Sequence, residues 1–339
     1  MRASGSGTAN SRRLSACSVL AAALLAGAVT FSHAQQGGWR PEKTVEIVIP
    51  SAAGSSLDAA ARMIQRALQE ARLVDVPVTV VNRTGGGGSI AQNYIDQRAG
   101  DPHYLFLSTM SLLNNHILGR AKTNWTDYTP IAMLFSEDMT IITQRDSPLK
   151  TGRDVMEQLR KDQQSVSFAV GFTAGGTGHL NVAIIATAMG VDAKRLKTVQ
   201  FQGNAQALAA LMGGHVDLSS MSFAQAWRAS QQGNVRILGV ASERRGEGPL
   251  ADIPTWKEQG FSVEFSNTRI MFGAKGISQA QTEFWDFTLQ KALGHDMWKE
   301  FAQKNHYKSD YTGHKESPKR LAALYDDIRK ALISVGLAK

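Results

Sequence analysis

The first residues that suggest chemistry form a loop without bulky side chains, Ser51–Ser56. A β-branched run, Val45–Ile49, ends at Pro50 immediately before the loop, and Asp58 lies in the first turn of a predicted helix after it. Backbone N–H groups in such a loop can approach a ligand closely, and the N-terminus of a helix attracts negative charge. The loop is therefore interpreted as an anion-binding site, with an ordinary strand-to-helix turn as the alternative.

Two further loops of small or polar residues follow predicted strands later in the chain. Phe172–Gly178 lies between the strand Val166–Val170 and the helix His179–Met189, and its plan matches that of the first loop. The turn Gln202–Asn204 also lies between a strand and a helix. We expect two separate parts of the chain to supply such loops to one ligand site.

The motifs of phosphate-binding, hydrolytic and metal-binding enzymes are missing from the sequence. The glycine run Gly85–Gly88 lacks the Gly-Lys-Ser/Thr ending of a P-loop and the spacing of a dinucleotide fingerprint, so it is interpreted as a tight turn facing a cleft. Two places after Ser89 the chain has Ala91, where a hydrolase nucleophile elbow needs glycine. The eight histidines show no metal-ligand spacing. We therefore predict a protein that is not an enzyme and has no metal or cofactor.

The elements that must position these loops alternate between strands and helices. Val45–Ile49, Val76–Val81 and Tyr104–Ser108 are predicted strands with helices between them, which indicates a parallel sheet. Ligands of such sheets gather at the carboxyl ends of the strands. A longer strand or strand pair, Ile131–Thr143, leads to the polar link Gln144–Lys150, which is the first predicted hinge.

The second part of the chain repeats this plan, and the pattern then changes. Short strands are predicted at Val263–Phe265 and Ile270–Gly273, followed by helices near Gln279–Leu293, Asp296–Lys304 and Pro318–Val335. This order predicts an α/β fold of two lobes with two chain crossings and a parallel-rich sheet flanked by helices in each lobe. Residues 39–143 plus 253–339 are assigned to lobe 1, and residues 144–252 to lobe 2.

The first residues of the chain predict export. Three arginines, the last at Arg13, precede an apolar stretch, and Ser32-His33-Ala34 completes a small-x-small cleavage site, so residues 1–34 are predicted to be a signal peptide. Cys17, the only cysteine, precedes the apolar stretch, which argues against lipid attachment. Removing these three arginines lowers the net charge from +8 to +5. The remaining basic residues are scattered, which argues against a nucleic-acid partner and suits an anionic small molecule.

Six short motifs, collinear along the chain, resemble one family of transport receptors. They are Pro50-x-x-x-Gly54-x-x-x-Asp58, Asn82-Arg83-x-Gly85-x-Gly87-Gly88, Gly176-x-Gly178-His179-Leu180, Gly213-Gly214-x-Val216-Asp217-Leu218, Arg236-Ile237-Leu238 and Asp252-Ile253-Pro254-Thr255-x-x-Glu258-x-Gly260. No single motif is specific, but the set resembles the periplasmic solute receptors of tripartite tricarboxylate transporters, the Bug or TctC family. The resemblance runs from Trp39 to the C-terminus.

This resemblance implies a monomeric, two-lobed periplasmic binding protein of type II, the Venus-flytrap class. Such a protein closes on a small carboxylate and delivers it to the permease subunits of a membrane transporter. The ligand-binding positions that the resemblance and the small-residue loops indicate are Gly54, Ser55, Ser56, Asp58, Ser108, Thr109, Thr173, Gly176, Thr177, His179, Gln202 and Asn204. Asp58 can equally be a helix cap, and His179, in the first turn of a helix, is expected to be neutral.

The sequence departs from the family pattern at four places. It has Asp101-Pro102-His103-Tyr104 in place of Asp-Gly-Tyr-Thr, Met271 in place of an aromatic residue, Lys275 in place of proline, and Met221 in place of aspartate. An acid at position 221 could pair with a ligand ammonium group. Met221 therefore favours a carboxylate ligand without an essential amine.

Two other functions compete with the transport receptor. A secreted α/β hydrolase with a serine nucleophile would need a base and an orienting acid beside the serine, and no elbow motif accompanies the serine-rich loops. A ligand-sensing subunit of a membrane signalling system would use the same closed form as an uptake receptor. The sequence does not separate sensing from uptake.

The signal-peptide interpretation predicts that the exported protein begins at Gln35, because Ala34 completes the cleavage site. Intact-mass measurement of the exported protein should give the mass of residues 35–339. An intact Met1 end, or a lipid on Cys17, would contradict the prediction.

Overall fold

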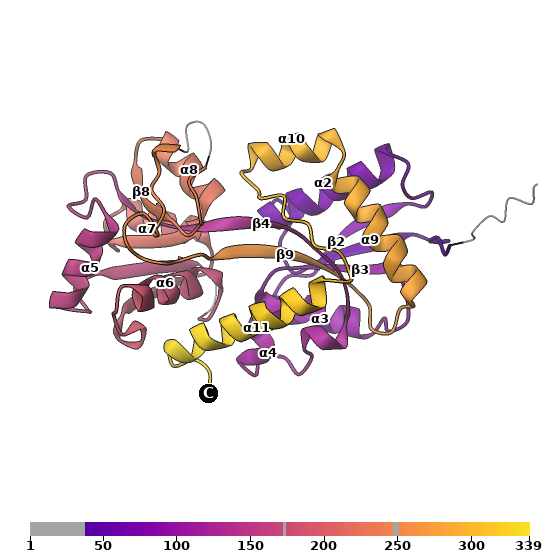
Figure 1. Cartoon of the computed structure of the whole chain (residues 1–339), viewed down its shortest axis with the longest axis horizontal. Helices are drawn as coiled ribbons and strands as arrows, with labels where there is room; N and C mark the ends of the chain where they lie inside the picture. Colours follow the sequence, from indigo (N-terminus) through magenta and orange to yellow (C-terminus); the bar gives the residue numbers. More distant parts are fainter. Residues whose placement is uncertain (1–37, 172–173, 247–250) are drawn as a thin grey trace, which may run out of the picture. The chain divides into compact units, whose positions relative to one another are not determined.

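Two runs of parallel strands share one long strand, and this sharing organises the chain from Trp39 to Lys339, which forms one unit (Figure 1). The structure is a computed structural model that describes residues 38–171, 174–246 and 251–339. The predicted signal peptide 1–34 and the predicted site residue Thr173 lie outside the described residues.

The strands are β1 (Val45–Ile49), β2 (Val78–Asn82), β3 (Tyr104–Ser108), β4 (Thr129–Gln144), β5 (Ser167–Gly171), β6 (Lys197–Phe201), β7 (Leu218–Ser222), β8 (Val235–Val240) and β9 (Ser266–Gly273). The helices are α2 (Ser56–Glu70), α3 (Ser89–Asp96), α4 (Ser111–Ile117), α5 (Gly152–Lys161), α6 (Thr177–Ala188), α7 (Asn204–Met212), α8 (Phe223–Gln231), α9 (Gln279–Leu293), α10 (Asp296–Lys304) and α11 (Ser317–Ser334). Short 3₁₀ turns lie at Gly86–Gly88, Trp125–Asp127 and Ala193–Arg195.

Strand β4 belongs to both runs of strands. It pairs with β9 from Thr129 to Asp138, and from Met139 onward it pairs with β7 and β8. We call β1, β2, β3, β9 and β4 up to Asp138 the first half of the sheet, and the remaining strands the second half. The order is β2-β1-β3-β9-β4-β7-β5-β6, with β8 also on β4.

The strand directions make the two halves face each other. In the first half β1 is parallel to β2 and β3, while β9 is antiparallel to both β3 and β4, so β4 runs in the same direction as β1. In the second half β7 is antiparallel to β4, and β5 is parallel to both β6 and β7. The carboxyl ends of β1, β2 and β3 therefore point toward the second half, and those of β5, β6 and β7 point toward the first.

Apolar side chains continue from one half into the other. A buried cluster includes Val48 and Phe106 of the first half together with Phe168 and Leu180 of the second. Helix α11 contributes Leu321, Ile328 and Leu332 to this cluster and packs against both α4 and α6. The apolar stripe of α11 thus packs against α4 and α6, in addition to β4 of the sheet.

A buried ion pair connects β4 and β9. The carboxylate of Glu137 on β4 accepts a hydrogen bond from the guanidinium of Arg269 on β9, and the two side chains are only 3% and 4% exposed. Arg269 Nη1 also donates to the carbonyl oxygen of Asn267 at 3.0 Å. A charge this deep in the protein needs such partners, because losing its hydration costs several kcal/mol.

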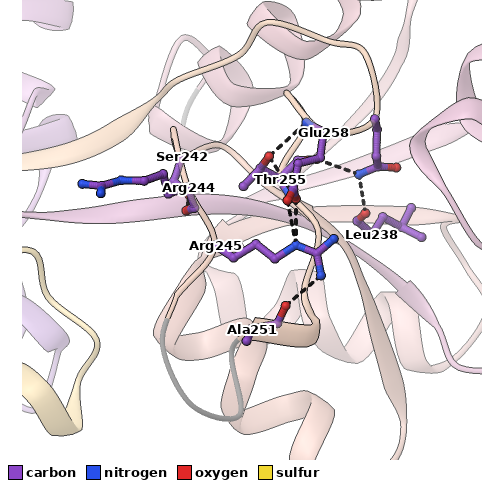
Figure 2. A network of polar contacts seen from close by, with 8 residues as sticks. Leu238, Ser242, Arg244, Arg245, Ala251, Thr255 and Glu258 are labelled. Atoms are coloured by element: carbon purple, nitrogen blue, oxygen red, sulfur yellow. Dashed lines mark hydrogen bonds and ion pairs between the residues drawn. The ribbon is translucent and has the colours of Figure 1, made fainter.

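A polar network between β8 and β9 joins Arg245 to residues 251–259, as Figure 2 shows. Glu258 accepts hydrogen bonds from the Thr255 amide at 2.8 Å and from Arg245 Nε at 2.8 Å, and Arg245 Nη1 donates to Ala251 O at 2.7 Å. The Thr255 amide and Arg245 lower the pKa of Glu258. Gln259 ties this segment to β8 by donating to Leu238 O at 3.0 Å. The Asp252–Gly260 motif therefore has a structural role before β9.

The structure differs from the sequence prediction at three points. Val263 and Phe265 are buried and Glu264 is exposed, but these residues are not a strand, because within the described residues only Phe265 bonds to the neighbouring backbone, at Ala241 and Met139. Helix α4, immediately after β3, was not predicted. The sequence also predicts a hinge at 144–150, whereas β4 changes partners between Asp138 and Met139. The lobe limits at 143/144 and 252/253 stay a prediction.

The buried pair predicts the effect of removing one charge at the crossing. Replacing Arg269 with methionine leaves the Glu137 carboxylate buried without its cation, so the free energy of unfolding should fall by about 3–5 kcal/mol. The double variant Glu137→Leu, Arg269→Met should recover most of this loss. Urea unfolding followed by circular dichroism measures both; a single variant as stable as the wild type would contradict the prediction.

Candidate functional site

The candidate site is the region where the carboxyl ends of the two sets of strands face each other. The first half contributes the loops after β1, β2 and β3, and the second half contributes those after β5, β6 and β7. All of these loops lead into helices, namely α2, α3, α4, α6, α7 and α8. The predicted site residues that the structure describes lie on these loops, strand ends and helix starts, from Gly54 to Asn204.

The loop after β1 is held by Asp58, which is 3% exposed. Its carboxylate accepts hydrogen bonds from the Gly54 amide at 2.9 Å, from Arg62 Nε at 3.0 Å and from Asn82 Nδ2 at 2.9 Å. Burial by itself raises the pKa of Asp58, but these three hydrogen bonds outweigh it and lower the pKa. Both oxygens of this carboxylate are engaged in fixing the loop.

Ser55 is the N-cap of α2. Its hydroxyl oxygen accepts a hydrogen bond from the Asp58 amide at 3.2 Å, which leaves its own O–H free to donate elsewhere. Asn82 extends the arrangement by donating to Ser51 O at 2.9 Å, so the end of β2 is fastened to the loop after β1. The neighbouring Ser56 is half-buried and begins the helix.

The glycine run after β2 is the tight turn that the sequence predicts. All four residues, Gly85–Gly88, have positive φ angles, which only glycine adopts at low cost. The side chain of Asn115 on α4 donates to Gly87 O at 2.9 Å and to Gln92 Oε1 at 3.2 Å. The turn is thereby joined to the helix after β3.

Arg83, shortly before the glycine run, makes a cation–π contact with Tyr94. Its guanidinium lies 4.1 Å from the centre of the Tyr94 ring, and that of Arg98 lies 3.6 Å from the same centre. This contact orients the chain as it enters the turn.

The strand end at Ser108 and Thr109 is also organised by hydroxyl groups. Ser108 is buried and donates to Thr109 O at 3.0 Å. Thr109 Oγ1 accepts from the Ser111 amide at 3.1 Å and donates to Ser111 Oγ at 3.0 Å. Sequence reasoning missed Ser111 and Asn115, although a polar residue immediately after a strand end is the signal that located Ser108.

In the second half, His179 and Gly175 hold the loop after β5. The Gly175 amide donates to His179 Nδ1 at 3.1 Å, so the ring hydrogen of the neutral imidazole must be on Nε2. Burial lowers the pKa of His179, in agreement with the neutral form that we expected. Gly176 and Thr177 follow at the start of α6.

Polar groups at the turn before α7 hydrogen-bond to side chains of α7 and α8. Asn204 Nδ2 donates to Gln225 Oε1 of α8 at 2.6 Å, and the Gln202 amide donates to Gln206 Oε1 at 3.1 Å. Met221, where the family pattern has aspartate, is 1% exposed and packs in an apolar cluster with Ile142.

In the part of the chain that the structure describes, several helices that begin at the candidate site lack a side-chain N-cap, although α2 is capped by Ser55 and α11, away from the site, also lacks one. Helices α3, α6, α7 and α8 begin at Gly88, Gly176, Gly203 and Ser222, and within the described residues none of these has a side-chain cap hydrogen bond. Helices α5, α9 and α10 are capped by Thr151, Ser278 and His295. An uncapped N-terminus keeps unpaired N–H groups and the positive end of the helix dipole. These two features together suit an anion.

Neither a metal-ligand cluster nor a membrane-spanning helix is present in the described residues. Across residues 38–171, 174–246 and 251–339, no group of three or more histidine, cysteine, aspartate or glutamate side chains could hold a metal ion. In the same part of the chain, no helix is both long and apolar enough to cross a membrane.

The fold and the facing loops define a two-lobed binding protein of the periplasmic type, and solved structures share this fold. A protein of R. palustris solved with adipate is 22% identical, with 88% of this chain and 99% of that chain covered and a TM-score of 0.77. MatC of Rhodopseudomonas palustris, solved with bound malate, is 21% identical, with 87% and 99% covered and a TM-score of 0.71. The predicted fold class is confirmed.

The chain belongs to the tripartite tricarboxylate transporter family of receptors, because the TctC model, described as "Tripartite tricarboxylate transporter family receptor", matches residues 60–333. A curated relative from Pseudomonas sp., described as "UPF0065 protein in tcbD-tcbE intergenic region", is 26% identical over 283 residues, which are 81% of each chain. The resemblance found in the six motifs is thereby confirmed.

The lowered pKa of His179 predicts a pH effect on folding. The folded state binds fewer protons at this ring than the unfolded state, whose pKa is 6.5, so its contribution to stability is present above pH 6.5 and is lost as the pH falls toward the folded-state pKa. His179→Asn keeps an acceptor near the Nδ1 position but does not titrate. The stability advantage of the wild type over this variant should therefore shrink on acidification.

Urea unfolding at several pH values between about 5 and 8 measures this difference. His215→Asn is the matched control, because it makes the same substitution at an exposed position. Parallel profiles for the wild type and His179→Asn would show that His179 does not titrate differently in the two states.

Proposed function

We propose that this protein is a periplasmic solute-binding protein that captures a small carboxylate between its two lobes and delivers it to the permease subunits of a tripartite tricarboxylate transporter. The observation that carries the proposal is the set of uncapped N-termini of α3, α6, α7 and α8, which begin at facing strand ends of both halves. Their unpaired amides can bind carboxylate oxygens.

Family membership and structural relatives support the same class of ligand. The family consists of transporter receptors, and the two solved structures of this fold carry malate and adipate, which are both dicarboxylates. The buried Met221 supports a ligand without an essential amine, because no carboxylate is present at that position to pair with an ammonium group. We extend this to a periplasmic, monomeric receptor without a nucleic-acid partner, cofactor or enzymatic activity.

Within the site we assign two kinds of role. The amides of Gly176 and Thr177, the hydroxyl groups of Ser55 and Thr109, and the Nε2–H of His179 are proposed to contact the ligand directly, together with Ser56, Ser108, Gln202, Asn204 and, outside the described residues, Thr173. Asp58 and Gly54 are proposed to act one step away, because the Asp58 carboxylate already accepts the Gly54 amide. Their role is to keep the loop after β1 open to the ligand.

Direct binding tests this proposal with malate and adipate as probes. A ligand present at a hundredfold excess over its Kd stabilises the folded state by about 2.7 kcal/mol, so either probe should raise the melting temperature of the wild type if it binds. Carboxylates should give the shifts, whereas sugars and amino acids should not. Shifts caused only by uncharged compounds would contradict the anion site.

Gly176→Asp tests where the carboxylate binds. Gly176 has φ −69°, which aspartate adopts without strain, and aspartate is a favourable N-cap that would place a negative charge at the uncapped start of α6. The variant should fold at least as well as the wild type but lose the carboxylate-induced melting shift.

Gly176→Asn is the matched control, because asparagine also caps the helix and has the same shape without the charge. It should lose far less affinity than Gly176→Asp in isothermal titration calorimetry. Equal affinities for the wild type and Gly176→Asp, with folding checked by circular dichroism, would mean that the carboxylate binds elsewhere.

A further inference from the structure

The chain at Ala174 and Gly175, after β5, is held from both halves of the sheet, and Arg120 Nη2 donates to Ala174 O at 2.8 Å. Asn114 on α4, in the first half, donates from Nδ2 to the carbonyl oxygen of Gly175 at 2.8 Å. On the other side of the same residue, the Gly175 amide donates to His179 Nδ1 within the second half. Asn114 and Gly175 are buried, so water does not replace these bonds easily.

Packing around Gly175 makes this contact close. Its φ is +75°, and a Cβ atom added there would lie 2.8 Å from Leu118 Cδ1 and 3.1 Å from Leu332 Cδ2. Leu118 follows α4, and Leu332 lies on α11, the helix that packs against both α4 and α6. The loop is therefore seated against the first half by a hydrogen bond and by apolar contact together.

The next residue connects this contact to the candidate ligand site. Gly176 is the N-cap of α6, so the position of Gly175 fixes where the first amides of α6 point. A separation of the two halves at this point must break the bond between Asn114 and Gly175. Water would hydrate the exposed donor and acceptor in the separated form, so the closed form gains the net free energy of one hydrogen bond.

We propose that Asn114 is a positioning residue for ligand capture, which acts by clasping Gly175 when the two lobes are closed. The choice of malate and adipate as ligands rests on the proposed function, whereas the effect of the Asn114–Gly175 bond on lobe closure does not. A ligand shifts the equilibrium between open and closed forms only by its differential affinity for them. The Asn114–Gly175 clasp stabilises the closed form before the ligand arrives, so less of the binding energy of the ligand is needed for closure.

Asn114→Ala tests the clasp in the full-length mature chain. Spin labels on Glu157→Cys and Glu283→Cys, which are exposed positions in the second and first halves, report the distance between the halves by double electron–electron resonance. The ligand-free variant should show a larger population at long distances than the ligand-free wild type. Its affinity for malate or adipate should fall about tenfold, the effect of one lost buried hydrogen bond.

Gln65→Ala is the matched control, because Gln65 Nε2 donates to Val78 O at 2.6 Å entirely within the first half. It loses the same kind of bond and should leave both the distance distribution and the affinity unchanged. If Asn114→Ala does not fold, Gly175→Ala serves instead, since its added Cβ pushes the loop away from Leu118.

The outcomes separate this proposal from the proposed function. If neither probe binds the wild type, the proposed ligand class fails, and the ligand-free distances alone decide on the clasp. Distances in Asn114→Ala that match those of the wild type would overturn the clasp. An equal loss of affinity in Gln65→Ala would also overturn it, because it would point to general destabilisation.

Discussion

The structure depends on the antiparallel pairing of β4 with its partners in both halves of the sheet. Both β9 and β7 are antiparallel to β4, but β3 is antiparallel to β9 whereas β5 is parallel to β7, so the two sets of parallel strands run toward each other from the two sides. The carboxyl ends of strands are where α/β sheets bind ligands. One long strand therefore places two such edges face to face, and the buried pair of Glu137 and Arg269 lies close to the point where it changes partners.

Within the described chain, several helix N-termini at the facing edges have no side-chain cap. Helices away from these edges, such as α5 and α9, carry side-chain caps that use their first amides. At the facing edges α6 and α7 begin at glycine and keep those amides unpaired. Glycine in place of a capping side chain costs a helix only about a few tenths of a kcal/mol, and this is the kind of local cost that proteins accept at functional sites.

The departures from the family pattern have local structural explanations. His103 Nδ1 lies 2.8 Å from Asp101 Oδ1, while its Nε2 accepts the Glu42 amide at 3.2 Å, so this histidine fastens the start of the described chain to β3. Met271 is fully buried on β9, in the core of the first half. Lys275 lies 3.7 Å from the carboxylate of Asp127 just beyond the end of the same strand.

The sequence by itself determined the α/β class, most strands and helices, the small-residue loops and the family, because these follow from local patterns of apolar residues and glycine. Only the tertiary structure decided that the Asp58 carboxylate is fully engaged and that β4 changes partners at Asp138, since both depend on partners distant in sequence. The same reason applies to Val263–Phe265, where Val263 and Phe265 join one buried cluster without forming a strand ladder. The bond from Asn114 to Gly175 joins residues that are 61 positions apart, so no local pattern could have indicated it.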